Sequence, residues 1–397
     1  MMFQKLFVTL PHPRKDDGET FRCCPRAQGL KYYIHKIIIT EATMNIEKLI
    51  KILNTSSPSG CERESIEFVR KELYGICRSE TDSMGNLYLY QGANSGLKIM
   101  ITAHADEVGF QITDINDDGF VYFRKTVGLD VQTIPGTMVT AVTKNGTIDG
   151  VIGKRPPHVL SPEEKNKLPN IENLWIDFGF MSKSEALSKI EVGDYIVARS
   201  CAFLSNNGRR VISKGLDNKI SLFILIELFK LLSRTPLPVQ IIGVATTQEE
   251  LGCRGSIISA NKICPDVAFC LDVGIATDTP NWPSHQYGSF SLGKGVGIIR
   301  NADNNEILTQ VLANTALKHD IPFQYTTGFK PSGGTEAKII QQSYRGIPTA
   351  NISIPNRYMH SVVEMCDLQD VEGAIRLLEK GIEAISHFTP SDFYLFK

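Results

Sequence analysis

The hydrophobic pattern of this chain changes twice, and that change limits the folds that the chain can adopt. From residue 44 onward, segments with helical periodicity alternate with short apolar segments rich in β-branched residues. Between residues 109 and 206 the pattern changes to short strands separated by Asp-Gly, Asn-Gly and Gly turns. The alternation of helices and strands then returns. This order predicts an α/β domain that is interrupted by a small all-β domain.

The chain is also too long for one ordinary compact domain, because it has 397 residues. We therefore expect residues 44–108 and 207–397 to form the α/β domain, with residues 109–206 inserted as the β domain. The helices of the α/β domain are predicted at residues 45–54, 60–74, 217–233, 254–262, 304–319, 334–343 and 367–387. Its strands are predicted at residues 86–90, 97–103, 239–246, 266–272, 321–327 and 347–354.

Bulk composition narrows the classes of partner. Lysine and arginine number 42 and aspartate and glutamate 43, so the net charge is −1. This balance argues against a nucleic acid or a membrane surface recruited by bulk charge. The sequence has no uninterrupted apolar run of transmembrane length. The nine cysteines are scattered without a C-x-x-C pair, which predicts reduced thiols and a cytoplasmic protein.

The first 43 residues differ from the rest of the chain. They have no strong helical period and no apolar segment followed by a signal-peptide cleavage site. A helix signal begins at "MNIEKLIKILNTSS". The segment "TEATMN" can be encoded by a stretch that contains GGAGG shortly before an ATG, which is the form of a bacterial ribosome-binding site. We therefore expect translation to start at Met44, with residues 1–43 as a leader of doubtful authenticity. The alternative is an organellar transit peptide, which Asp16, Asp17 and Glu19 disfavour because such peptides are poor in acidic residues.

Side chains that can bind a metal follow the apolar strands of the α/β domain. The expected strands end at or lead into His104 and Asp106, Glu249 and Glu250, Asp272, and His360. The carboxyl ends of strands are where open α/β sheets place their ligand sites. Asp217 opens a helix, where the helix dipole favours an anionic side chain. Each residue alone has a common structural role, such as a helix cap. Their convergence on one sheet edge predicts a metal site instead.

The donor set fits two metal ions. Zinc and cobalt accept imidazole and carboxylate together. Two such ions need about six ligand positions, and they lie ~3.5–4 Å apart around a shared hydroxide. Five side chains fill six ligand positions if Asp217 bridges the two ions. These side chains are His104, Asp217, Glu250, Asp272 and His360.

The two adjacent glutamates raise a separate question. Two carboxylates held so close to each other raise each other's pKa. On an extended strand end, neighbouring side chains point to opposite sides. One glutamate could therefore bind metal while the other acts as a general base. Spacing alone does not decide between Glu249 and Glu250. Asp106 is well placed to accept the second N–H of the His104 ring and so orient it.

The motifs "HADEVGF", "GLDNK", "TTQEELGCRGS", "LDVG", "SGGTEA" and "MHS" together resemble the tetrahedral (TET) aminopeptidases. That metallopeptidase family includes glutamyl, leucyl and lysyl aminopeptidases and proteins formerly called cellulases or endoglucanases. The resemblance covers about residues 44–388. It implies a mixed-sheet zinc-peptidase domain of the phosphorylase/hydrolase-like kind, with an inserted barrel or PDZ-like domain used for dimerisation. A hollow dodecamer of six dimers is common in the family.

Carried over by position, the resemblance assigns the metal ligands. One metal would be held by His104, Asp217 and Asp272, and the other by Asp217, Glu250 and His360. Glu249 would be the general base. Deleting residues 109–206 would then leave the metal ligands in place. The family usually has GGTD where this chain has a glutamate, Glu336, and the leader has no counterpart that we identify.

The expected reaction is hydrolysis of the first peptide bond of a short peptide, without a covalent intermediate. A metal-dependent amidohydrolase or deacetylase acting on small N-acyl compounds is the closest alternative. A glycosidase is disfavoured, because retaining enzymes hold two carboxylates ~5–5.5 Å apart across a sugar, which adjacent residues facing opposite ways suit poorly. A non-catalytic assembly protein is a further class, but every expected ligand is present.

Overall fold

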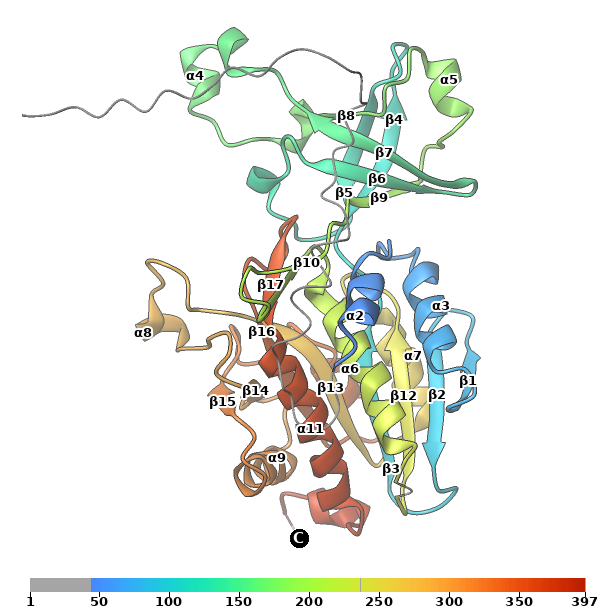
Figure 1. Ribbon diagram of the computed structural model, residues 1–397, viewed down its shortest axis with the longest axis vertical. Helices are drawn as coiled ribbons and strands as arrows, with labels where there is room; N and C mark the ends of the chain where they lie inside the picture. The colour runs from blue at the N-terminus through green and yellow to red at the C-terminus, as the bar shows by residue number, and fades with distance from the viewer. Residues whose placement is uncertain (1–43, 236, 397) are drawn as a thin grey trace, which may run out of the picture. The chain divides into compact units, whose positions relative to one another are not determined.

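The computed structural model describes residues 44–235 and 237–396 (Figure 1). The expected leader, residues 1–43, lies outside the described residues. An eight-stranded mixed sheet forms the centre of the α/β domain, and a separate six-stranded sheet closes into a barrel. The predicted fold class, an α/β domain with a small inserted β domain, is confirmed.

The large sheet places four neighbouring parallel strands at its centre. Its strands, in spatial order, are β1 (Arg78–Thr81), β2 (Leu87–Gly92), β12 (Gln240–Thr246), β3 (Lys98–His104), β13 (Val267–Ile275), β16 (Thr349–Asn356), β14 (Val296–Ile299) and β15 (Phe323–Thr326). Strands β12, β3, β13 and β16 run parallel to one another. Their carboxyl ends therefore meet at one edge of the sheet. These are the four strands that carry the metal-capable side chains in the sequence.

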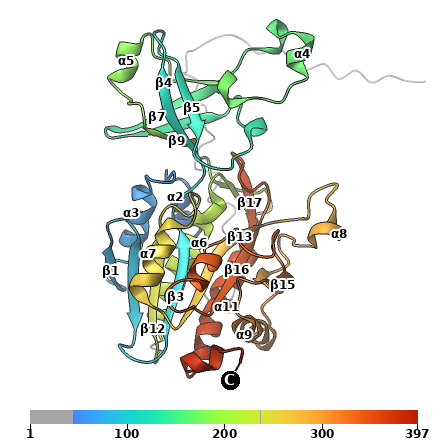
Figure 2. The same ribbon diagram turned by 180° about the vertical axis from the view of Figure 1, so that it is seen from behind.

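Helices cover both faces of the sheet, which explains why its central strands are apolar throughout rather than alternating. One face packs against α2 (Ile46–Leu53), α3 (Arg63–Glu72), α6 (Leu216–Leu232), α9 (Glu306–Lys318) and α11 (Leu368–Ile385). The other face packs against α7 (Arg254–Ile263) and α10 (Ala337–Gln341). The opposite views in Figures 1 and 2 show these two layers. Helix α6 is buried almost all round, which suits its mostly apolar sequence after Lys219.

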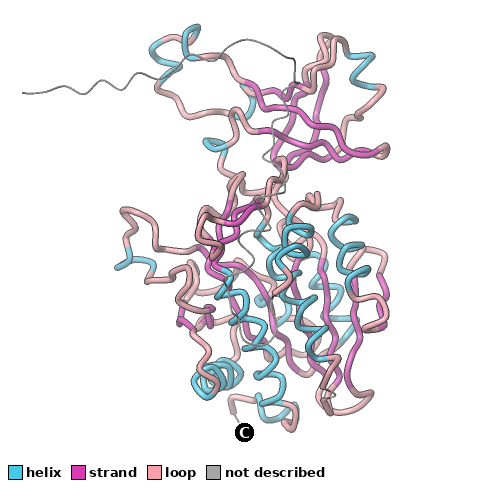
Figure 3. Tube along the Cα trace, in the orientation of Figure 1, coloured by secondary structure: helices cyan, strands magenta, loops and turns pink. Residues whose placement is uncertain are grey.

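The inserted domain has its own core. The barrel order is β4 (Phe110–Ile115), β5 (Val121–Lys125), β8 (Trp175–Asp177), β7 (Gly146–Gly153), β6 (Met138–Thr143) and β9 (Tyr195–Ala198). Alternate residues of these strands, such as Phe110, Ile112 and Ile196, point into a core separate from that of the large sheet. Short helical turns connect the strands: η2 (Val131–Thr133), η3 (Pro157–Val159), α4 (Pro162–Lys165), η4 (Ile171–Asn173) and α5 (Lys183–Leu187). Figure 3 shows that strand and loop dominate this domain.

A three-stranded sheet of β10 (Phe203–Leu204), β11 (Arg210–Ser213) and β17 (Glu364–Asp367) completes the strands, with α8 (Ser284–Tyr287) and η5 (Pro390–Phe393) as further short helices. Strands β1, β14 and β17 were not predicted, because each has only four residues; β1 is polar, and β17 buries acidic side chains. Helix α10 begins later than predicted, because Gly333 and Gly334 before it have positive φ. In the described part of the chain, no helix is long and apolar enough to span a bilayer.

Candidate active site

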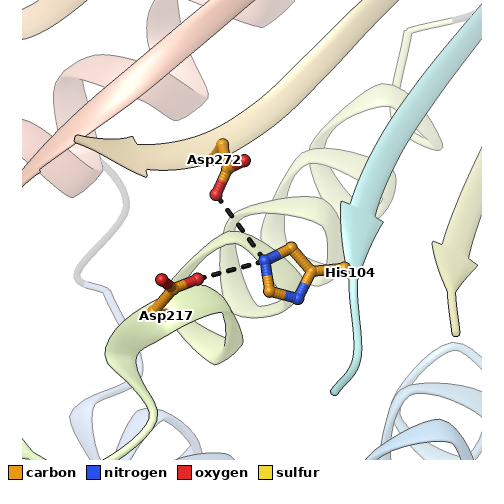
Figure 4. A group of neighbouring side chains, drawn as sticks. All are labelled: His104, Asp217 and Asp272. Atoms are coloured by element: carbon orange, nitrogen blue, oxygen red, sulfur yellow. Dashed lines mark ion pairs between the residues drawn. The ribbon is translucent and has the colours of Figure 1, made fainter. Parts of the chain in front are cut away.

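The predicted metal-binding side chains come together at the carboxyl edge of the four central strands. His104 is the last residue of β3, and Asp272 lies within β13, which continues past the predicted end of that strand. Asp217 lies at the start of α6, where its ψ of 101° is extended rather than helical. Figure 4 shows His104 facing both carboxylates, with its Nε2 3.0 Å from Asp217 Oδ1 and 3.7 Å from Asp272 Oδ1.

These three residues form a buried group whose ligand atoms all lie within 4.8 Å of one another. The His104 ring is held from its other side by Asp106. Its Nδ1 lies 3.1 Å from the Asp106 carbonyl oxygen and 3.4 Å from the Asp106 Oδ1 atom. The Nε2 lone pair is thereby directed at Asp217 and Asp272, as expected for a metal-binding histidine.

A second group contains Asp217, Glu250 and His360, again with ligand atoms within 4.8 Å. His360 Nε2 lies 3.3 Å from Asp217 Oδ2 and 3.4 Å from Glu250 Oε1. Asp217 therefore belongs to both groups, with Oδ1 toward His104 and Oδ2 toward His360. A carboxylate with one oxygen in each group has the geometry of a bridging ligand.

Two observations fit a divalent cation in each group. The Oδ1 of Asp217 and the Oε1 of Glu250 are buried carboxylate oxygens without a hydrogen-bond partner, which is costly unless a cation satisfies them. In addition, the pKa values of side chains in both groups are strongly shifted. The nearby carboxylates of Asp217 and Glu250 raise the pKa of His360 to about 11, and burial raises the pKa of Asp272 to about 7. Imidazole and carboxylate oxygen are donors that zinc and cobalt accept together.

The two adjacent glutamates lie in a turn after the strand, which corrects the predicted strand geometry. Strand β12 ends at Thr246, and Gln248 has a positive φ of 55°. The pair therefore does not lie on an extended strand end. Glu250 contacts His360, whereas the Oε2 of Glu249 lies 4.0 Å from the Nε2 of His104. The turn directs one carboxylate to each group.

Asp106 holds this turn as well as the His104 ring. Its Oδ1 accepts the backbone N–H of Glu249 at 2.9 Å, and its Oδ2 accepts that of Glu250 at 3.1 Å. Its Oδ2 also accepts the Ser59 hydroxyl at 2.7 Å. One buried carboxylate thus connects the first histidine to both glutamates.

Glu249 lies beside the first group but belongs to neither of the two candidate metal-binding groups. Burial raises the pKa of its carboxyl well above the usual range, with nearby carboxylates such as Asp272 and Glu250 adding to the effect. The thiol of Cys253 donates to its Oε1 at 3.2 Å. A partly enclosed carboxyl with a raised pKa beside a ligand cluster has the properties of a general base.

Sequence reasoning missed Glu364, whose carboxylate connects the backbone of Asp217 with that of His360. This glutamate is 1% exposed. Its Oε2 accepts the backbone N–H of Asp217 at 2.9 Å, and its Oε1 accepts that of His360 at 3.1 Å. Burial raises its pKa to about 8. The only signal in the sequence is its place four residues after His360, in a segment without an apolar period.

A second missed cluster involves the lysines on either side of Asp217 in the sequence. The buried carboxylate of Glu107 accepts from the ammonium groups of Lys214 and Lys219, at 2.5 and 2.6 Å to its Oε1. Both ammonium groups also donate to the carbonyl of Thr55. Because Glu107 directly follows Asp106 and Lys219 ends the motif "GLDNK", this cluster anchors two of the segments that carry the site.

Glu336, which replaces the aspartate usual in the family, lies beside β12. It is 2% exposed, and its Oε1 accepts the hydroxyl of Thr246, whose residue pairs with His104 across the sheet. Its Oε2 is buried without a partner. The longer side chain is thus accommodated inside the protein next to the strand that leads to the two glutamates.

A mixed α/β sheet whose edge gathers two adjoining sets of histidine and carboxylate is the arrangement of a metal-dependent hydrolase. The sequence matches the M42 glutamyl aminopeptidase family over residues 85–377, and the chain belongs to this family of metal-dependent aminopeptidases. The predicted resemblance is therefore confirmed.

Individual relatives and solved structures are similar to this chain over most of its length. The chain is 30% identical to the lysyl aminopeptidase of Pyrococcus furiosus, over 87% of this chain and 98% of that protein. The crystal structure of a TET aminopeptidase from the marine sediment archaeon Thaumarchaeota archaeon SCGC AB-539-E09 superposes with a TM-score of 0.81 at 32% identity, covering 87% of this chain and 98% of that one. The TET1 peptidase of Pyrococcus horikoshii, which can assemble into a tetrahedron or a large octahedral shell, superposes with a TM-score of 0.76 at 34% identity, covering 85% and 98%.

Proposed function

We propose that this aminopeptidase is a dinuclear enzyme that removes the N-terminal residue of short peptides. The observation that carries the proposal is the position of Asp217, whose two carboxylate oxygens face two different histidines. A single-metal site would have no use for a buried carboxylate shared in this way. Two divalent cations at the site would polarise the scissile carbonyl and lower the pKa of a water shared between them.

The ligands follow from the two groups. His104, Asp217 and Asp272 would hold one ion, and Asp217, Glu250 and His360 the other. Zinc or cobalt suits this mixture of nitrogen and oxygen donors. Asp106 and Glu364 would act on these ligands indirectly, because they hold the histidine ring and the backbone to which the ligands are attached.

Glu249 is the residue that we assign to proton transfer. It would take a proton from the attacking water and deliver it to the leaving amine, a role typically worth ~10²–10⁴ in rate. Its carboxylate lies beside the first group without belonging to either set of ligands. Its position is held by Asp106 through the backbone N–H and by Cys253 through Oε1.

The test is reconstitution of metal-stripped protein, separately with zinc, cobalt and manganese. Each preparation would be assayed on aminoacyl-anilides with a free amino group and on N-acetyl amino acids, and its bound metal would be measured. We expect two ions per subunit and hydrolysis of the unblocked anilides alone. Binding of a single ion would refute the dinuclear site. Preferential cleavage of the N-acetyl compounds would replace the aminopeptidase with an amidohydrolase or deacetylase.

We also propose that residues 44–108 and 207–397 act as the catalytic domain and residues 109–206 as the domain through which subunits form dimers and a dodecamer. The tetrahedral assembly of Pyrococcus horikoshii TET1 supports this, as do exposed apolar side chains on the barrel. Met138 and Val151 are paired across two barrel strands and are 52% and 40% exposed. Light scattering should show a dimer or a dodecamer, and a strict monomer would contradict the proposal. The cytoplasmic location stays a prediction.

A further inference from the structure

The ring of His360 is held by a residue of the inserted barrel domain. Its Nδ1 lies 2.8 Å from the carbonyl oxygen of Gly128, 232 positions away in the sequence. Because that carbonyl can only accept, Nδ1 is the nitrogen that keeps its proton, and in the neutral ring that a metal requires Nε2 carries the lone pair. The contact therefore directs Nε2 toward Asp217 and Glu250, as Asp106 does for the ring of His104.

Two more contacts join the same segments. The backbone N–H of Asp130 donates to the carbonyl of His360 at 3.2 Å. Val362, two residues after His360, packs against the core of the barrel. His360 itself has a positive φ of 59°, a conformation that a non-glycine residue adopts only when its surroundings hold it there.

The barrel fixes the segment that makes these contacts. Leu129, between Gly128 and Asp130, is 4% exposed and belongs to the barrel core. Its N–H donates to the carbonyl of Val127 at 2.8 Å, and the N–H of Thr126 donates to the carbonyl of Gly109 at 2.9 Å. The Gly128 carbonyl thus owes its position to an apolar anchor and to hydrogen bonds within the inserted domain.

We propose that residues 126–130, the barrel loop, form part of the support of the second metal group and set its affinity for a divalent cation. The inference rests on the proposed dinuclear function. It assigns the inserted domain a positioning role within each subunit, separate from assembly. Deletion of residues 109–206, which is expected to leave the metal ligands in place, would then still weaken the second group, because it removes the partner of His360 Nδ1.

The test compares two leucines of the same barrel core. Leu129→Ala removes the anchor of the barrel loop, whereas Leu174→Ala removes the same atoms from another part of that core, where the side chain is 3% exposed. Zinc affinity would be measured for each ion by competition with a chelator, and the visible spectrum of the cobalt-loaded protein would report ligand geometry. We expect Leu129→Ala to weaken one of the two ions by about 10–100-fold, the usual effect of losing an outer partner of a ligand, and to change the cobalt spectrum. Leu174→Ala should retain both ions.

A second pair of variants covers the case in which Leu129→Ala fails to fold. Asp130 has a φ of −72°, which proline also adopts, and its side chain accepts the N–H of Gln132. Asp130→Ala loses that side-chain bond and keeps the N–H that donates to His360, whereas Asp130→Pro loses both. The proline variant should bind the second ion more weakly than the alanine variant.

The outcomes separate the two proposals. If the unmodified protein binds only one ion, the dinuclear function fails, and this inference fails with it. If the unmodified protein binds two ions and Leu129→Ala holds both as tightly, the role of the barrel loop alone is refuted. Equal loss of metal in Leu129→Ala and Leu174→Ala would refute it in the same way, because the effect would then be general loosening of the barrel.

Discussion

His104 and His360 face the same carboxylate, that of Asp217, from two different surroundings. The His104 side chain is 2% exposed, and the group that orients it lies two residues away. The His360 side chain is 35% exposed, and its orienting carbonyl belongs to another domain. The first half of the site is built by local sequence and a buried strand. The second half depends on contacts between distant segments, so it should respond first to changes outside the catalytic domain.

The largest effect should come from the glutamate that belongs to neither group. Glu249→Gln keeps the size of the side chain but removes the proton acceptor. We expect turnover to fall by ~10²–10⁴ while bound metal stays near the level of the unmodified protein. Metal analysis beside the rate measurement reads out both quantities. Loss of metal that excess zinc restores would show that Glu249 is a ligand and that the roles of the two glutamates are reversed.

Glu250→Gln should separate the second group from the first. Replacing an anionic ligand with a neutral amide weakens one ion, so we expect metal content to drop toward one ion per subunit. Excess zinc or cobalt should restore part of the rate, which distinguishes this variant from Glu249→Gln. Retention of both ions together with an irreversible loss of rate would contradict the assignment.

Glu364→Gln tests whether one carboxylate couples the two halves. Its two oxygens accept from the backbone of Asp217 and of His360, and an amide keeps only one acceptor. We expect both ions to bind at least about 10-fold more weakly, in contrast to the weakening of a single ion in Leu129→Ala. Zinc titration of the two variants side by side makes the comparison. A change confined to one ion would mean that Glu364 serves a single group.

The smallest expected effect concerns Glu62, which contacts the start of the turn that carries Glu249 and Glu250. Glu62 accepts the backbone N–H of Gln248 at 3.1 Å, and burial raises its pKa from 4.5 to about 7. The folded protein therefore binds this proton more tightly than the unfolded chain does. The resulting stabilisation is complete below about pH 4.5 and is lost as the pH rises through 7.

Glu62→Gln stays neutral at every pH and can still accept the hydrogen bond. At pH 8 we expect it to exceed the unmodified protein in free energy of unfolding by on the order of 2 kcal/mol, and the difference should shrink toward pH 4.5. Urea unfolding of both proteins across this range measures it. A difference that is constant with pH would show that Glu62 titrates normally.

The periodic parts of the molecule could be predicted from the sequence, and the long-range contacts could not. Buried parallel strands are apolar runs, so β12, β3, β13 and β16 were found with their polar ends. The roles of Glu249 and Glu250 needed the family resemblance, because the turn that carries both residues depends on the positive φ of Gln248. Gly128 carried no local signal, and Glu364 carried only its place four residues after His360. Their contacts with His360 require β17 and the barrel loop to lie beside the segment that follows β16.

The closure of the barrel has a consequence for anything that docks on it. Every strand of the barrel has a paired neighbour on both sides, although β7 pairs with β8 only from Val151 to Gly153. A second subunit that docks on the barrel would therefore meet side chains over most of its surface. Such recognition can be strengthened, weakened or redirected one substitution at a time, without disturbing the backbone ladder that shapes the barrel.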